Sequence, residues 1–197
     1  MSDTQTIPPE VLEGVRKGED HAWRELIRLL SPQVYSIIRR QIRSTAEHDD
    51  LAQETFTKIF LKLDRFAGKN EFRHWVSRVA INTCYDWLRK KKSRPLSSFS
   101  DLSEKEESII SQTLVGESPE NDDNLNELRR ILDRLISSLN PKEQIVIRLL
   151  DLEENSVHDV CELTGWGASK VKVTAMRARG KLAGMLKAIN RRDLEHE

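Results

Sequence analysis

The residues with the clearest chemical potential lie near the C-terminus, where basic side chains recur along one predicted helix. Residues 165–192 carry eight Lys or Arg and no acid, a net charge of +8. Val171, Ala175, Ala178 and Leu182 recur at helical spacing, so we expect them to pack inward. The residues then expected to face outward are Lys172, Val173, Met176, Arg177 and Lys181. Such a set of cations with one flexible apolar group suits the major groove of DNA.

The segment before this helix completes a predicted helix-turn-helix. Ser156-Val157-His158-Asp159 is a helix-start signal, and Gly165-Trp166-Gly167 predicts a tight turn before a last helix from about Ser169 to Ile189. In DNA-binding proteins the second helix of such a pair enters the major groove. An ordinary amphipathic helix in a bundle is the alternative that this pattern leaves open.

A second basic block covers residues 72–94, with seven Lys or Arg against one acid. Within it Arg78, Asn82, Tyr85 and Arg89 follow i, i+4, i+7, i+11 spacing, a stripe suited to backbone phosphates and an unstacked base. Residues 100–127 are the opposite, with nine acids against one Lys. Two basic blocks separated by an acidic one indicate two polyanion-binding modules, although solvated helix faces would give the same charges.

Catalytic and metal-binding patterns are not found in the sequence. His48, His74 and His158 have no partners at ligand spacing, and Cys84 and Cys161 lie 77 positions apart. There is no P-loop and no Ser–His or Cys–His arrangement, so we expect a protein that is not an enzyme, with no catalytic residues, no metal and no cofactor. No apolar run approaches the roughly 20 residues of a membrane span. We therefore expect a cytoplasmic protein without a signal peptide or membrane insertion.

Helical periodicity dominates the chain, and the predicted class is all-α. Helical segments are expected at 8–43, with a break at Ser31-Pro32, at 47–63 and at 70–92. The apolar face of the second comprises Leu51, Phe56, Ile59, Phe60 and Leu63. Asn140-Pro141-Lys142-Glu143 predicts a capped helix start. We expect two small helical domains, 8–95 and 124–190, joined by a flexible acidic linker, 96–123.

Two long stretches resemble a known family. HDDLAQETFTKIFLKLDRFAGKNEFRHWVSRVAINTCYDWLRKKKSRP (48–95) resembles region 2 of extracytoplasmic-function sigma factors, through Asp-Leu-x-Gln-Glu-x-Phe, Phe-x-Gly…Phe-x-x-Trp and Ala-x-Asn-x-x-x-Asp-x-Leu-Arg. LNPKEQIVIRLLDLEENSVHDVCELTGWGASKVKVTAMRARGKL (139–182) resembles region 4 of the sigma-70 family, through its Leu-x-Pro-x-x start and its Val-Lys…Arg-Ala-Arg helix.

The resemblance implies an alternative sigma factor that binds core RNA polymerase and directs promoter-specific initiation. The implied partners are the β′ clamp helices and the β flap of the polymerase, promoter DNA and an anti-sigma factor. The resemblance also implies that the factor nucleates melting of the promoter DNA. Residues implied to bind core polymerase are Asp49, Asp50, Gln53, Glu54, Thr57 and Leu61. Those implied at the −10 element are Phe66, Lys69, Asn70, Glu71, Arg73, Arg78, Asn82, Tyr85 and Arg89. Those implied at the −35 element are Ser169, Lys170, Lys172, Val173, Met176, Arg177 and Arg179.

Two other functional classes compete with this interpretation. A conventional DNA-binding regulator would use the C-terminal helix pair, but it leaves the acid-leaning face of 48–63 and the loop 66–72 unexplained. An adaptor protein would bring its basic faces to acidic partners. Transcription started by the chain and core polymerase alone separates these classes from a sigma factor.

Overall fold

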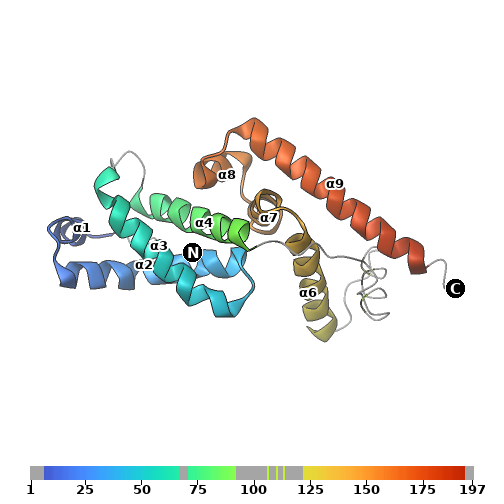
Figure 1. Cartoon of the computed structure of the whole chain (residues 1–197), viewed down its shortest axis with the longest axis horizontal. Coiled ribbons are helices and arrows are strands. Elements are labelled where there is room, and N and C mark those ends of the chain that lie inside the picture. Colours follow the sequence, from blue (N-terminus) through green and yellow to red (C-terminus); the bar gives the residue numbers. More distant parts are fainter. Residues whose placement is uncertain are drawn as a thin grey trace. The chain divides into compact units, whose positions relative to one another are not determined.

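The computed structural model describes residues 7–66, 71–91, 106, 110, 113 and 122–193, and every regular element within these ranges is a helix (Figure 1). The predicted all-α class is thus confirmed. The chain divides into two compact units: one comprises Met1–Trp87 and Ser156–Gly167, and the other Leu88–Asn155 and Ala168–Glu197. Most of the predicted linker, and the loop residues Lys69 and Asn70, lie outside the described residues.

The first unit begins with α1 (Pro9–Arg16) and α2 (Asp20–Gln41). Between them the chain turns at Gly18, whose φ of +78° is in the left-handed region that glycine adopts without a steric penalty. Buried side chains recur every four residues along α2, which gives this helix a continuous apolar face. These residues are Ala22, Leu26, Leu30, Val34 and Ile38.

Pro32 lies inside α2, so the helix break expected at Ser31-Pro32 is wrong. A proline within a helix loses one backbone hydrogen bond and costs about 3 kcal/mol. Leu30 and Val34 are fully buried on either side of it, and burial of each such side chain contributes about 1.5–3 kcal/mol. The Ser31 hydroxyl also donates to the carbonyl of Ile27 at 2.7 Å. Packing on both sides therefore outweighs the local cost of the proline.

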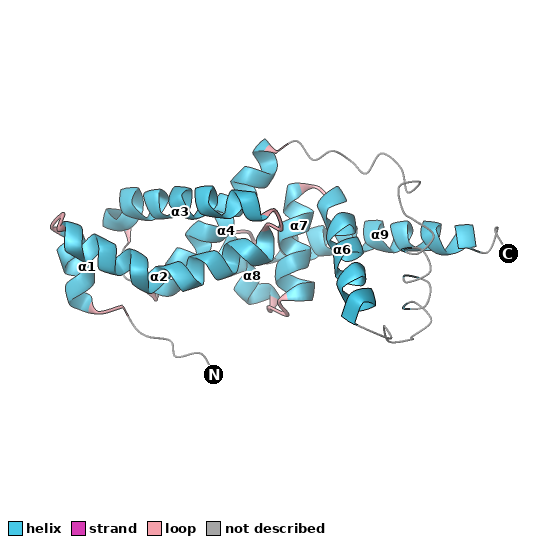
Figure 2. Ribbon diagram, turned by 90° about the horizontal axis from the view of Figure 1, so that it is seen from below, coloured by secondary structure: helices cyan, strands magenta, loops and turns pink. Residues whose placement is uncertain are grey.

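The helix α3 (His48–Lys62) packs along α2, as Figure 2 shows, and α4 (Phe72–Lys90) completes the bundle. Short 3-10 turns precede and follow α3, at Thr45–Glu47 and Leu63–Arg65. The core between the helices is formed by apolar side chains, among them Leu51 and Ile59 of α3 and Val76 and Ala80 of α4. The Gln33 amide donates to the Arg73 carbonyl at 2.7 Å, which fixes α4 against α2.

The first unit also contains α8 (Val157–Thr164), which starts where the sequence predicted, and there Ser156 and Asp159 form a capping box. The helix ends at Gly165, whose φ is +74°. A side chain there would be strained and would collide with the guanidinium of Arg78. The left-handed backbone conformation therefore favours glycine at this end of α8.

The second unit consists of α6 (Asp122–Ser138), α7 (Pro141–Ile147), a π turn at Arg148–Leu152 and the long α9 (Ala168–Asp193). The predicted cap of α7 is present: Asn140 Oδ1 accepts from the Glu143 backbone N–H at 3.1 Å. The core joins α6 and α7 to α9 through Ile136, Leu139, Ile147 and Ala178, with Leu182 at its edge. A second cluster contains Ile110, Ile131 and Leu135.

Candidate functional site

The first candidate surface is the α3 ridge, which comprises Asp49, Asp50, Gln53, Glu54, Thr57 and Leu61. All six side chains are exposed except that of Glu54, which is half-buried. The opposite face of α3 is anchored by the buried Leu51, Thr55 and Ile59. Glu54 forms an ion pair with Lys58 at 2.8 Å, and Lys58 forms a second ion pair with Asp86 of α4 at 3.4 Å. The ridge is thus held from behind and presents carboxylates and an amide outward.

An apolar end of this ridge was only half predicted. Leu61 is 69% exposed, as expected, but Phe60, assigned to the buried face, is 53% exposed. The Phe60 ring lies edge-on to Trp23 of α2, with ring centroids 5.2 Å apart. Two adjacent large apolar side chains in solvent, beside acidic and amide groups, are typical of a surface that binds another protein.

The second candidate surface is the predicted stripe on α4. Arg78 and Arg89 are exposed, and Asn82 and Tyr85 are half-buried. The Asn82 amide donates to the Arg78 carbonyl at 2.8 Å, one turn earlier in the same helix. Within the first unit the rings of Tyr85 and Trp166 form a T-shaped pair, with ring centroids 5.3 Å apart. The stripe therefore presents two cations with an amide and an aromatic ring between them.

The remaining predicted −10 residues do not all lie on this stripe. Arg73 is half-buried, and its guanidinium donates to Gln33 of α2 at 3.0 Å. Phe66 packs against Phe72 and Trp75, with ring centroids 5.1 and 5.5 Å apart. Glu71 is exposed. Phe66 thus belongs to an aromatic cluster at the start of α4.

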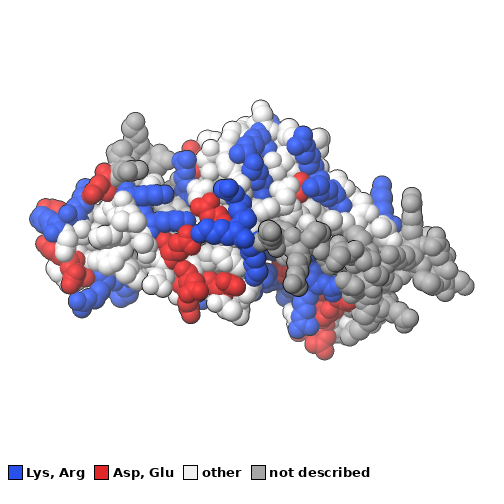
Figure 3. Space-filling view, viewed as in Figure 1, with Lys and Arg blue, Asp and Glu red and all other residues white. Residues whose placement is uncertain are grey.

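The third candidate surface is the outer face of α9. Val171, Ala175 and Ala178 are buried, and Leu182 is half-buried, as the spacing predicted. Met176 is 66% exposed and Val173 is 41% exposed. The cations and the hydroxyl on the same outer face, all exposed, are Ser169, Lys170, Lys172 and Arg177. In Figure 3 basic side chains extend along α9 and α4, and acidic side chains gather over α3.

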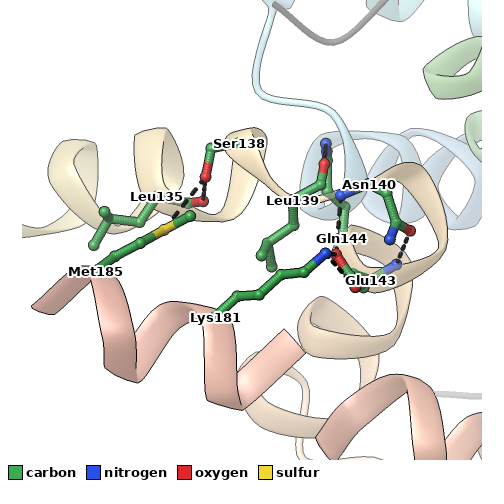
Figure 4. A network of polar contacts seen from close by, with 8 residues as sticks. All are labelled: Leu135, Ser138, Leu139, Asn140, Glu143, Gln144, Lys181 and Met185. Carbon is green, nitrogen blue, oxygen red and sulfur yellow. Dashed lines mark hydrogen bonds and ion pairs between the residues drawn. The ribbon is translucent and has the colours of Figure 1, made fainter. Parts of the chain in front are cut away.

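Two cations of α9 are bound by carboxylates of their own unit, which the sequence did not reveal. Arg179 forms a two-point ion pair with Asp151, at 2.6 and 3.2 Å. The pKa of Arg179 is raised, mainly by these hydrogen bonds and then by the Asp151 charge. Lys181 reaches across to the buried carboxylate of Glu143, at 2.8 and 2.9 Å, as Figure 4 shows.

The described histidines and cysteines were the candidates for metal-binding groups. In the described part of the chain, no three His, Cys, Asp or Glu side chains are grouped closely enough to hold a metal ion. Cys84 is buried and Cys161 half-buried, and neither forms a disulfide. The ring of His48 lies 2.8 Å from the carbonyl of Ile42, a contact within the fold. No described helix is long and apolar enough to cross a bilayer.

Comparison with known proteins finds two matching stretches of the chain. Family models described as Sigma-70 region 2 and Sigma-70, region 4 match residues 26–94 and 129–182. The ECF RNA polymerase sigma-E factor of Escherichia coli (strain K12) is 31% identical over 183 residues, which cover 92% of this chain and 95% of that protein. The ECF RNA polymerase sigma factor SigW of Bacillus subtilis (strain 168) is 26% identical over 177 residues, 89% and 95% of the two chains.

A solved structure shares the fold. CnrH, in complex with the cytosolic domain of CnrY, superposes with a TM-score of 0.54 at 20% identity, over 91% of this chain and 96% of that one. At this level of identity the likeness concerns the arrangement of helices alone.

Proposed function

This chain belongs to the extracytoplasmic-function group of the sigma-70 family and directs promoter-specific transcription, and we propose that three of its helices divide that task. The α3 ridge binds core RNA polymerase, α4 and the loop before it bind and melt the −10 element, and α9 reads the −35 element. The corresponding domains are 8–95 and 124–190, with 96–123 as the linker.

The polymerase contact is assigned to the β′ clamp helices. A helical pair with basic and apolar side chains would complement the exposed Asp50 and Gln53 and the apolar Phe60 and Leu61. The exposed Leu61 is the observation that carries the proposal, because a regulator that only binds DNA has no use for an apolar protein-binding surface on α3.

Melting at the −10 element is assigned to the α4 stripe and to residues 66–71. Turning one base out of the duplex costs a few kcal/mol. Arg78 and Arg89 can neutralise phosphates of the separated strand, and Asn82 and Tyr85 offer an amide and a ring to an unstacked base. Lys69 and Asn70 are proposed to contribute from the loop. The free energy of polymerase binding offsets the rest of this cost, so the factor acts only on the assembled enzyme.

Recognition at −35 is assigned to the outer face of α9. Lys172, Val173, Met176 and Arg177 would face base edges, with Ser169 and Lys170 closer to phosphates. The helices α6 and α7 would contact the β flap. Arg179, which the resemblance implies at the −35 element, is engaged by Asp151 and so has a competing partner.

The protein is proposed to act in the cytoplasm, without catalysis of its own. Its relative CnrH is bound by the cytosolic domain of another protein, CnrY. We propose a comparable protein partner of the anti-sigma type for this chain, one that covers the DNA-binding and polymerase-binding surfaces until it is released.

Run-off transcription tests this function. Purified protein and core polymerase together should start discrete transcripts that neither produces alone, and mapping their 5′ ends identifies the promoter. A conventional regulator would give transcripts only when another sigma factor is added. An adaptor would give none with core polymerase and would leave the transcripts made with another sigma factor unchanged.

A further inference from the structure

We propose that Glu143 and Asp151 form a two-point clamp that sets the rotation of α9 about its axis and withholds Arg179 from the DNA backbone. This inference rests on the proposed role of α9 at the −35 element. It makes the two carboxylates positioning residues for promoter recognition, and it makes Asp151 a determinant of specificity.

The geometry of α9 separates the clamped cations from the outward-facing ones. Successive residues of a helix are about 100° apart around its axis. Counted from the buried stripe of Val171, Ala175 and Ala178, Arg177 falls on the outer half of the helix. Arg179 and Lys181 fall on opposite flanks of the buried stripe, where each can reach the elements beneath α9.

The two carboxylates come from one continuous segment under α9. Glu143 lies in the first turn of α7, where it also accepts the backbone N–H of Asn140 at 3.1 Å, and its side chain is only 4% exposed. Asp151 lies in the π turn that follows α7. Because Glu143 holds one flank of α9 and Asp151 the other, rotation in either direction would break an ion pair.

The Asp151 contact also changes which cations are available to DNA. An arginine held at both Nε and Nη2 by one carboxylate has the planar, two-bond geometry that it would otherwise use for a phosphate. Arg177, two residues earlier, has no ion pair within the described ranges. Asp151 thus prevents Arg179 from contacting a phosphate, a contact that would not depend on DNA sequence. Arg177 remains available to bind base edges.

The test replaces Asp151 by Asn, which keeps the shape and removes the charge. Full-length protein is assembled with core polymerase, and binding is measured to the mapped promoter duplex and to the same duplex with a scrambled −35 element. Each added phosphate contact steepens the dependence of log affinity on log salt by about 0.9. At low salt, Asp151→Asn should therefore bind scrambled DNA more tightly than the wild-type protein does. Between about 50 and 200 mM salt, its affinity should fall by a factor about 3.5-fold larger than the factor for the wild-type protein. Its preference for the intact element should fall.

The matched controls are Arg179→Ala and the double variant Asp151→Asn/Arg179→Ala. Arg179→Ala alone should leave the salt dependence unchanged, and the double variant should return to the wild-type slope. Glu143→Gln, which loosens the other flank, should reduce discrimination between the duplexes without steepening the slope.

Two results would overturn the clamp. One is an Asp151→Asn variant that binds both duplexes more weakly with an unchanged slope, which is what a purely structural ion pair predicts. The other is a shallower slope for Arg179→Ala alone, which would mean that Arg179 already contacts a phosphate. If wild-type holoenzyme does not distinguish the duplexes, the role of α9 itself fails, which is a separate outcome.

Discussion

The hydroxyl of Tyr35 donates a hydrogen bond of 2.8 Å to Oδ1 of Asp49, which ties the middle of α2 to the first turn of α3. This bond is the main reason that the pKa of Tyr35 lies above its ordinary value, followed by burial and by the Asp49 charge. One member of the α3 ridge is thus fixed from a neighbouring helix. Asp50, the next residue, is exposed at the same helix start and is the better place to test polymerase binding.

Reversal of charge at Asp50 should weaken the complex with core polymerase. Asp50→Lys removes a carboxylate from the proposed contact and places a positive charge opposite a basic partner. The expected loss of binding free energy is about 1–2 kcal/mol. The affinity is measured by titration of fluorescently labelled protein with core enzyme. Glu10→Lys, an exposed charge reversal on α1, is the control. Wild-type affinity for Asp50→Lys would remove this residue from the interface.

Replacement of Leu61 by a charged residue tests the apolar part of the same ridge. Leu61 is 69% exposed, so Leu61→Asp should leave the stability of the free protein nearly unchanged while it weakens core binding. The two readouts are urea unfolding and co-purification with core polymerase. Unfolding at lower urea with full binding would show that Leu61 serves the fold instead.

Arg177→Ala should lower selectivity for the −35 element. A two-point contact between an arginine and a guanine is worth about 1–3 kcal/mol of discrimination. Competition between intact and scrambled promoter duplexes measures this difference on the holoenzyme. Lys187→Ala, an exposed cation farther along α9, is the control. An equal loss on both duplexes would reduce Arg177 to a phosphate contact.

Removal of Asp133 should destabilise the second unit strongly. Asp133 lies 3.0 Å from the guanidinium of Arg148, whose side chain is only 4% exposed. Removal of one partner of a buried ion pair costs about 3–5 kcal/mol. Urea unfolding of Asp133→Ala measures the loss, with Arg130→Ala in the exposed Arg130–Glu127 pair as the control. Equal stabilities for the two variants would contradict the expected cost.

The cap of α8 should be sensitive to acid. The pKa of Asp159 is lowered from 3.8, first by the hydroxyl of Ser156 and then by its backbone N–H. A folded pKa below the unfolded value stabilises the fold above about pH 4, and this stabilisation is lost as the pH falls through the lowered pKa. Ser156→Ala should move the pKa of Asp159 back toward its ordinary value in an NMR titration. An unchanged pKa would mean that the hydroxyl is not its main cause.

Local periodicity in the sequence predicted the faces and caps of helices, but it did not predict contacts between distant residues. The buried and exposed sides of α9 follow from the spacing of Val171, Ala175 and Ala178, and the cap at Asn140 and Glu143 follows from residue types at fixed offsets. Glu143 could therefore be recognised as a cap but not as the partner of Lys181, which is 38 residues away. Nor does a helical pattern indicate that Arg179 meets Asp151.

Two errors have the same origin. Phe60 was assigned to the apolar stripe of α3, yet it is 53% exposed and its ring meets that of Trp23 of α2. Pro32 is a helix breaker by its own chemistry, but buried residues on both sides hold α2 together. Each outcome was decided by a neighbouring helix, whose position no local pattern contains.

The π turn at Arg148–Leu152 has a consequence for insertions and deletions. Such a turn holds one residue more than a turn of α-helix, so everything after it is offset by about 100° from a regular continuation. Deletion of a single residue there would yield a smoother, more regular helix. It would also change the direction in which the Asp151 side chain points. The helix would become more regular, but Arg179 would lose its ion-pair partner. The number of residues in this stretch, and not only their identity, is under constraint.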